Sequence, residues 1–171
     1  NTQDIAYMQH ALALATRAEG EGEVPVGALV VLNGEIIGEG WNQPILSHDP
    51  TAHAEIIALR TAAAKVGNYR LSGATLYVTL EPCPMCAGAM VHARVARVVY
   101  GAADPLAGSA GTVFNLLNAA ALNHRAEVQG GVLAEWPGRP RGVDAAHLRI
   151  FLEPWATVQS GQAVEFHRLP E

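Results

Sequence analysis

The chain has 171 residues, of which 50% are apolar and 16% are charged, and this suffices for one domain with a sizeable core. Sixteen acidic residues against eleven basic ones give a net charge of −5, which argues against a protein that coats nucleic acid through bulk charge and leaves room for a local basic patch. The two cysteines, Cys83 and Cys86, are too few to cross-link the chain as a secreted disulfide scaffold.

The sequence also predicts a cytoplasmic protein without membrane attachment. No apolar run approaches the ~20 residues of a membrane helix, because charged residues or glycines interrupt each one. The first four residues (NTQD) contain neither the basic segment nor the apolar segment of a secretory signal.

The first third of the chain predicts a helix and a hairpin. Residues 3–18 place Ile5, Met8, Leu12 and Ala15 on one side of an amphipathic helix. A β-branched run predicts a strand over residues 26–32, and residues 35–40 return as a second strand. The Asn33-Gly34 pair between them is the strongest two-residue hairpin signal.

Helices and strands alternate after this hairpin. Thr51 is expected to cap a helix over residues 52–65, and Pro84 suits the first turn of a second helix that ends near His92. The other predicted elements are strands at 75–80, 95–100 and 127–128 and a short helix at 113–117, with loops at 41–50 and 101–111. The order predicts an α/β fold in which a mixed sheet has helices on both faces.

The last 36 residues differ in composition from the rest. They contain four of the ten prolines and two of the three tryptophans, and residues 136–142 (WPGRPRG) are incompatible with a regular helix. We therefore expect a domain over residues 1–135, followed by a divergent C-terminal segment, 136–171, that is not an independent domain. Asp144 is a candidate cap for a brief helix over residues 144–152.

Four residues predict a metal centre: His53 and Glu55, and some 30 positions later Cys83 and Cys86. The cysteines are spaced i, i+3, so both sulfurs lie on one face of a first helical turn, and His53 occupies the first turn of its own helix. Two helix N-termini that point toward one cavity lower thiol pKa values and favour the thiolates that a metal requires. One imidazole and two thiolates with an open fourth position are typical of catalytic zinc.

The charges in this group agree with zinc chemistry. Two thiolates cancel the +2 charge of the ion, so the complex can hold hydroxide without a large net charge. Glu55 lies two residues from His53, where it does not share the coordination geometry but can reach a bound water. We expect it to take a proton from that water and to deliver it to the substrate nitrogen and to the leaving amine.

Other interpretations of the same residues remain open at this stage. A Cys-x-x-Cys pair can be a redox dithiol, although the upstream His-x-Glu and the lack of a Trp-Cys-Gly-Pro-like context argue against it. A closed structural zinc site would need a fourth protein ligand, for which His48 and His92 are the nearby candidates. His92 ends its predicted helix and is better explained as a hydrogen-bonding residue there.

The combination of His-x-Glu with Pro-Cys-x-x-Cys is typical of zinc-dependent nucleobase deaminases. Longer segments resemble one family among them, the bacterial tRNA-specific adenosine deaminases of the cytidine and deoxycytidylate deaminase superfamily. These segments are residues 24–28 (VPVGA), 40–42 (GWN), 48–55 (HDPTAHAE), 76–83 (LYVTLEPC), 85–90 (MCAGAM), 123–125 (NHR) and 131–135 (GVLAE). The resemblance covers residues 1–135, about four-fifths of the chain.

The resemblance implies a three-layer, cytidine-deaminase-like fold with a central mixed five-stranded sheet, and a homodimer. It implies one Zn²⁺ per chain on His53, Cys83 and Cys86, with Glu55 as the proton shuttle. The implied reaction is deamination of adenosine to inosine at the wobble position of a tRNA anticodon stem-loop, typically that of arginine tRNA. The resemblance assigns substrate binding to Asn42, Val26 and Ala54, the first through hydrogen bonds to the flipped base and Val26 through apolar contact. An amide offers a donor and an acceptor to a purine edge, although Asn42 is also an ordinary turn residue after a strand.

The sequence departs from the family after residue 135. The family continues there with an unbroken helix, an Asp-Phe-Phe stretch and a basic end that helps to hold the anticodon stem-loop, whereas this chain has Trp136-Pro137. Residues 136–171 carry four arginines and four acids, so their net charge is zero. If this segment replaces the basic helix, Arg139 and Arg141 are the first candidates for RNA contact.

An RNA substrate would then require a local rim beside the pocket, for which the candidates are Arg70, Arg94, Arg125 and the loop over residues 104–109. Each of these arginines is equally compatible with a solvated or core-bracing role. Two alternatives to the RNA deaminase remain: a deaminase of a free nucleobase or nucleoside, of guanine or cytosine type, and a non-catalytic RNA-binding or scaffold subunit that keeps zinc for stability. Glu55 argues against the scaffold, although an acid in a first helical turn is common for dipole reasons alone.

Overall fold

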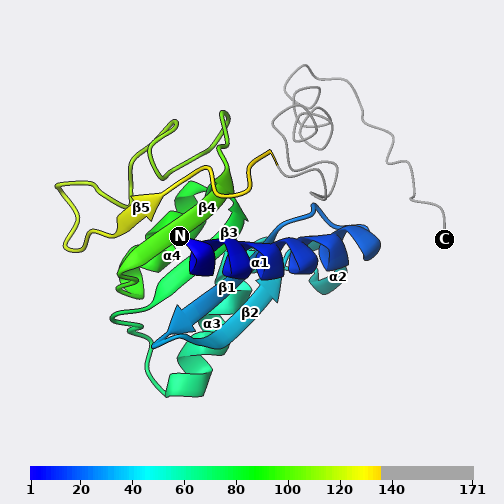
Figure 1. Cartoon of the computed structure of the whole chain (residues 1–171), viewed down its shortest axis with the longest axis horizontal. Helices are drawn as coiled ribbons and strands as arrows, with labels where there is room; N and C mark the ends of the chain where they lie inside the picture. The colour runs from blue at the N-terminus through cyan, green and yellow to red at the C-terminus, as the bar shows by residue number, and fades with distance from the viewer. Residues whose placement is uncertain (136–171) are drawn as a thin grey trace.

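The structure, a computed structural model, describes residues 1–135. The predicted helix over 144–152 and the candidate arginines Arg139 and Arg141 lie outside the described residues, and the proposed division into two segments stays a prediction. The centre is a five-stranded sheet in the order β2-β1-β3-β4-β5 (Figure 1). Its strands are β1 (Gly27–Leu32), β2 (Glu35–Trp41), β3 (Thr75–Leu80), β4 (Arg97–Ala102) and β5 (Glu127–Gln129).

The sheet is mixed, as expected. β1 pairs antiparallel with both β2 and β3, whereas β3 pairs parallel with β4 and β4 parallel with β5. The hairpin between β1 and β2 turns at Asn33 and Gly34, which have φ values of 52° and 78°. Positive φ at both central residues is the type I′ requirement that the Asn-Gly pair meets, so this prediction is confirmed.

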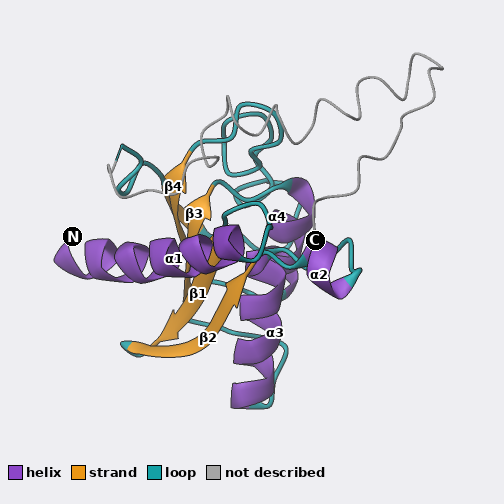
Figure 2. Ribbon diagram, turned by 90° about the vertical axis from the view of Figure 1, so that its right-hand side faces the viewer, coloured by secondary structure: helices purple, strands orange, loops and turns teal. Residues whose placement is uncertain are grey.

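Helices cover both faces of the sheet (Figure 2). α1 (Thr2–Gly20) lies on one face, while α3 (Ala54–Val66) and α4 (Pro84–His92) lie on the other. Strand side chains alternate accordingly: Leu29 and Tyr77 pack with α1, and their neighbours Val30 and Val78 pack with α3 and α4. None of the helices within residues 1–135 combines the length and the hydrophobicity that a membrane span requires.

Two glycines let α3 lie unusually close to β2. A Cβ atom at Gly38 would lie 2.4 Å from the Ala58 carbonyl oxygen, and one at Gly40 would lie 2.2 Å from that of Ala54. Any larger residue at either position would push the helix off the strand. The close contact fixes the N-terminus of α3 beside the end of β2, where the candidate site lies.

Three sequence predictions about local structure are wrong. The second long helix begins at Ala54 with His53 as its N-cap, not at residue 52 with Thr51 as cap, because the Thr51 hydroxyl donates to Asp49 Oδ1 in the preceding turn. Residues 113–117 form no helix; Asn115 forms an isolated β-bridge with Ala110 instead. The short helix α2 (Pro44–Ser47) lies in the segment predicted to be a loop.

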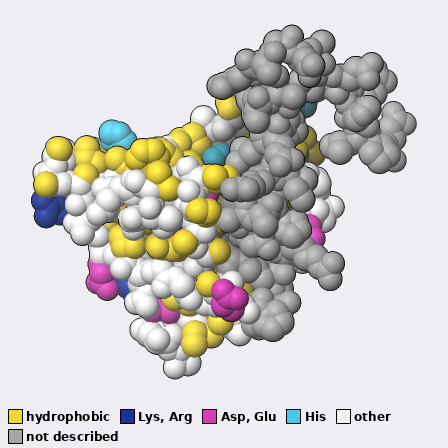
Figure 3. All heavy atoms as spheres, turned by 90° about the horizontal axis from the view of Figure 1, so that it is seen from above, with side chains coloured by type: hydrophobic (Ala, Val, Ile, Leu, Met, Phe, Trp, Pro, Cys, Tyr) yellow, Lys and Arg dark blue, Asp and Glu magenta, His cyan; other side chains and the backbone are white. Residues whose placement is uncertain are grey.

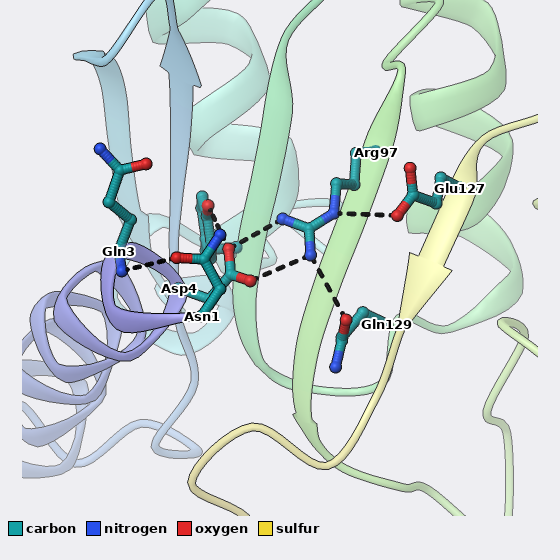
Figure 4. A network of polar contacts seen from close by, with 7 residues as sticks. Asn1, Gln3, Asp4, Arg97, Glu127 and Gln129 are labelled. Atoms are coloured by element: carbon teal, nitrogen blue, oxygen red, sulfur yellow. Dashed lines mark hydrogen bonds and ion pairs between the residues drawn. The ribbon is translucent and has the colours of Figure 1, made fainter.

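A buried ion pair joins α1 to the sheet (Figure 4). The Asp4 carboxylate accepts hydrogen bonds from Nη1 and Nη2 of Arg97 at 2.8 and 3.0 Å and from the Tyr77 hydroxyl at 2.8 Å. Arg97 also lies 3.4 Å from Glu127 Oε1 and donates to Gln129 on β5. The network therefore connects the start of α1 with strands β3, β4 and β5.

Candidate active site

The three predicted metal ligands meet at the N-termini of α3 and α4. His53 is the N-cap of α3, Cys83 is the N-cap of α4, and Cys86 lies in the first turn of α4. The Nδ1 atom of His53 lies 3.6 Å from Cys83 Sγ and 3.4 Å from Cys86 Sγ. Neither cap residue uses its side chain to cap its own helix, so both side chains are available to a ligand.

The distances in this cluster fit a zinc ion. Zn–S bonds of about 2.3 Å and Zn–N bonds of about 2.0 Å at tetrahedral angles separate sulfur from nitrogen by about 3.5 Å. Among the described residues, the cluster contains no fourth His, Cys, Asp or Glu. His48 is an exposed cap at the end of α2 and His92 lies in the last turn of α4, so neither completes a closed structural site. His53, Cys83 and Cys86 thus form a zinc site with three protein ligands and an open position.

The electrostatics of the thiols favour a cation. The pKa of Cys83 is lowered to about 4, chiefly by the hydrogen bond from Cys86 and also by the bond with His53, while burial opposes both. The same thiol–thiolate hydrogen bond, together with burial, raises the pKa of Cys86. The hydrogen bond with Cys83 raises the pKa of His53. A metal ion bound between the three side chains would displace the remaining protons and take over the charge that they balance.

Asn42 supplies the hydrogen bond that His53 does not give to its own helix. Its Oδ1 atom accepts from the backbone N–H of Ala54, the first residue of α3, at 2.8 Å. Asn42 is buried and follows directly after β2, and its backbone N–H donates to the Val26 carbonyl oxygen. The bond to Ala54 orients the side chain, and within residues 1–135 no other side-chain hydrogen bond of Asn42 competes with donation from its amide nitrogen to a substrate.

A cavity of about 270 Å³ opens beside the metal cluster. It is lined by Val24, Val26, Asn42, Pro44, His53, Glu55, Leu80, Glu81, Cys83, Asp104 and Ala107. The sequence-predicted residues His53, Glu55, Cys83, Asn42 and Val26 therefore share one cavity. Ala54 does not line it, because its side chain is completely buried.

Glu55 lies in the first turn of α3 with its carboxylate in this cavity. The residue is 4% exposed and is not a member of the metal cluster. Burial raises the pKa of Glu55 to about 7, against the effect of its own backbone N–H and of His53. A buried carboxyl group beside an open metal position is suited to holding and releasing a proton.

None of the three arginines predicted for the rim lines the cavity. Arg94 donates to the Val91 carbonyl oxygen at 2.7 Å and so closes the end of α4, and Arg70 lies against the ring of its neighbour Tyr69. Arg125 is exposed on the segment before β5. Seen from above, the described part of the surface is largely apolar or uncharged, with few basic side chains (Figure 3). The loop over residues 104–109, by contrast, does reach the cavity through Asp104 and Ala107.

Sequence reasoning missed two buried acids near the site, Glu23 and Glu81, of which Glu81 lines the cavity. Glu23 accepts the backbone N–H groups of Ile45 and Leu46 and so holds α2. Glu81 accepts three backbone N–H groups of the loop after β4. Both are less than 5% exposed. The signal for Glu81 was its position between a strongly apolar strand and Pro82-Cys83. A charged residue in such a buried segment is costly unless hydrogen bonds compensate for its lost hydration.

Comparison with known proteins agrees with this site. Residues 1–102 match the family model described as the cytidine and deoxycytidylate deaminase zinc-binding region. The chain is 55% identical over 133 residues to a tRNA-specific adenosine deaminase of Haemophilus influenzae, covering 77% of each chain. It is 53% identical over 134 residues to the Bacillus subtilis tRNA-specific adenosine deaminase, covering 78% of this chain and 83% of the relative.

Solved structures give the same result for the fold. A structure from studies of A-to-I editing by tRNA:A34 deaminases at the wobble position superposes with a TM-score of 0.74 at 41% identity, covering 76% of this chain and 94% of that one. A guanine deaminase from Bacillus subtilis superposes with a TM-score of 0.57 at 30% identity, covering 96% and 98%. The chain therefore belongs to the cytidine and deoxycytidylate deaminase family and, within it, to the tRNA-specific adenosine deaminases.

Proposed function

We propose that this protein hydrolyses adenosine 34 of a tRNA to inosine, releasing ammonia. The observation that carries the proposal is the coincidence, in one cavity, of a three-ligand zinc site with a buried Glu55 that is not a ligand. The identity of 55% to a tRNA-specific adenosine deaminase supports the substrate class. Arginine tRNA is the tRNA that the family resemblance favours.

The chemistry divides between the ion and the chain. When bound, zinc supplies a Lewis acid that makes a water molecule a nucleophile near neutral pH. His53, Cys83 and Cys86 hold the ion and leave one position open. Glu55 takes the two protons of the water one after the other, passing the first to the ring nitrogen next to C6 as the C–O bond forms and the second to the amine as the C–N bond breaks, so that adenosine and water give inosine and ammonia.

The substrate base is held by the residues that line the other parts of the cavity. Asn42, oriented by the hydrogen bond from Ala54 to its side-chain oxygen, donates to the base through its amide nitrogen. Val26, which is 5% exposed, offers an apolar contact to the ring. A cavity of about 270 Å³ lies at the small end of the range of small-molecule pockets and suits a single extruded base. We assign Ala54 only an indirect role, through the bond that orients Asn42.

Deamination of a free base is the second candidate, because the superposition with a guanine deaminase covers 96% of this chain. The lower identity, 30% against 55%, and the lower TM-score, 0.57 against 0.74, favour the tRNA enzyme. Both candidates use the same ligands and the same proton shuttle, so only the substrate distinguishes them.

The proposed enzyme is a cytoplasmic homodimer. An apolar groove of about 600 Å³ runs between α3 and α4 and includes Ile56, Leu59, Tyr69 and Met85. Tyr69 is 64% exposed and Met85 is 37% exposed, and a second copy of the chain would cover both. Light scattering on wild-type protein and on Met85→Glu checks this surface, and a monomeric wild-type protein would contradict it.

Ammonia release with four substrates tests the function. Purified protein with one zinc per chain is given an anticodon stem-loop with adenosine at position 34, free adenosine, guanine or cytidine. The proposal expects ammonia from the stem-loop and little from the free compounds. Faster release from guanine or cytidine would select the second candidate, and release from none of them, with zinc bound, would favour a scaffold.

A further inference from the structure

Glu81 occupies an unusual place for a charged residue. It follows β3 directly and precedes Pro82 and Cys83, and its side chain is 2% exposed. Within the described residues, no Lys or Arg forms an ion pair with it. Since an unpaired buried carboxylate is costly, its negative charge must be balanced by hydrogen-bond donors.

The donors are backbone N–H groups of one loop. Glu81 Oε2 accepts from Asp104 at 3.0 Å, and Oε1 accepts from Ala110 at 3.0 Å and from Thr112 at 3.1 Å. Both carboxylate oxygens are used, and all three donors lie in the segment that follows β4. The segment is therefore wrapped around the carboxylate.

Gly108 makes this wrapping sterically possible. A Cβ atom at this position would lie 2.3 Å from Glu81 Oε2 and 2.5 Å from the Asp104 carbonyl oxygen. A further hydrogen bond joins the loop to the segment after β3: the Ser109 N–H donates to the Pro82 carbonyl oxygen at 2.8 Å. The loop is thus fixed to the residues between β3 and α4 at several points.

The same loop forms part of the cavity wall. Asp104 and Ala107 line the cavity, and the Asp104 carboxylate accepts the N–H groups of Leu106 and Ala107, which fixes the turn between them. The metal ligands and Glu55, in contrast, are placed by the N-termini of α3 and α4. The position of this wall and the position of the reacting groups are therefore set by different contacts.

We propose that Glu81 is a positioning residue that holds loop 103–112 in the conformation that receives the RNA around the reacting adenosine. The inference rests on the proposed function, because it assigns the loop to the same substrate. It predicts that weakening the Glu81 contacts impairs substrate binding more than the chemical step.

Two variants weaken these hydrogen bonds, one by changing the acceptor side chain and the other by changing the loop that carries the donors. In Glu81→Gln, the amide nitrogen cannot accept a hydrogen bond, so at least one of the three N–H groups loses its acceptor. Gly108→Ala pushes the loop away from an intact Glu81. We expect each to raise KM for the stem-loop about tenfold while kcat changes less than about threefold, as for the loss of one hydrogen bond to a charged group. Zinc content should stay at one per chain.

Hydrogen exchange supplies a readout that does not depend on activity. In both variants, the amides of residues 103–112 should exchange about tenfold faster than in the wild-type protein, with the exchange of β3 and α3 unchanged. Asp4→Asn is the matched control, since it alters a buried carboxylate that has no contact with the loop. It should leave both the loop exchange and KM at wild-type values.

The possible outcomes distinguish failure of the proposed role of Glu81 from failure of the proposed tRNA deaminase function. Unchanged exchange in Glu81→Gln and Gly108→Ala would overturn the role of Glu81, whatever the substrate is. Faster exchange with unchanged KM would overturn the link between the loop and the RNA. A wild-type protein that is inactive on the stem-loop but active on guanine would instead refute the proposed function, and the KM comparison would then be made with guanine.

Discussion

Two buried carboxylates, Asp4 and Glu81, show how differently the two faces of the sheet are used. Asp4 is bonded to the side chains of Arg97 and Tyr77, which come from β4 and β3, so it connects elements that are far apart in sequence. Glu81 is bonded to backbone N–H groups of a single loop at the cavity. Similar burial therefore serves cohesion of the fold on the α1 face and the shape of a binding site on the other.

The helices on the two faces differ in the same way. The N-terminus of α1 is capped by its own Asn1 side chain, which accepts from the Gln3 N–H at 3.0 Å. The caps of α3 and α4 are His53 and Cys83, whose side chains make no capping bond. On the α1 face, the side chain of the cap residue therefore bonds its own helix. On the opposite face, the side chains of the cap residues His53 and Cys83 are available to bind the metal.

Removing a metal ligand should have the largest effect. Cys86→Ala takes away one of three protein ligands, so zinc should fall well below one per chain and turnover should become undetectable. Metal analysis by mass spectrometry, together with ammonia release, measures both. Full zinc retention in Cys86→Ala would contradict the ligand assignment.

The next largest effect should come from Glu55. Glu55→Ala removes the proton shuttle but no ligand, so kcat should fall about 10²–10⁴-fold while zinc content and circular dichroism stay unchanged. Steady-state kinetics on the anticodon stem-loop measures the loss. A rate close to wild type, or loss of zinc, would show that Glu55 has a different role.

Breaking the ion pair on the α1 face should reduce stability without affecting turnover. Arg97→Ala leaves the buried Asp4 carboxylate without its main partner and should lower the free energy of unfolding by about 3 kcal/mol. Urea unfolding measures this. Lys65→Ala is the matched control: its pair with Glu35 is also short, at 2.7 Å, but both side chains are exposed and screened by water, so the loss of stability should be much smaller than in Arg97→Ala.

A lower kcat in Arg97→Ala, measured below its unfolding transition, would contradict the separation of the two faces.

The pH dependence of stability should show the smallest effect. The hydrogen bonds from Arg97 hold the pKa of Asp4 below its ordinary value of 3.8. The folded state thus favours the carboxylate, and its contribution is complete above pH 3.8 and disappears as the pH falls through the lower folded-state pKa. The stability difference between wild type and Asp4→Asn should therefore shrink in that acidic range. Any loss of zinc at low pH occurs in both proteins and does not affect the difference between them. A stability difference that grows on acidification would show that folding raises, rather than lowers, the pKa of Asp4.

Local sequence signals predicted most of the sheet and of the metal centre. The hairpin at Asn33-Gly34 and the ligands His53, Cys83 and Cys86 each depend on neighbouring residues whose spacing is visible in the sequence. These are features for which periodicity and side-chain chemistry suffice.

Contacts between distant residues account for the errors. α3 starts two residues later than predicted because its first N–H is bonded by Asn42, 12 positions upstream of Ala54, so Thr51 is not needed as a cap. Over 113–117, where a helix was predicted, the N–H groups of Phe114 and Leu116 donate instead to the carbonyl oxygens of Gly108 and Ser109, six and seven positions earlier. No local sequence pattern predicts the ion pair between Asp4 and Arg97, because these residues lie 93 positions apart.

The most direct test of the account is to locate the product in RNA. The full protein is incubated with an anticodon stem-loop that carries adenosine at position 34 and with a matched stem-loop whose adenosine lies elsewhere in the loop, and nuclease digestion with mass spectrometry identifies inosine. We expect inosine at position 34 of the first RNA, little in the second, and none with Glu55→Ala. Equal conversion of both RNAs, or conversion by Glu55→Ala at the wild-type rate, would contradict it.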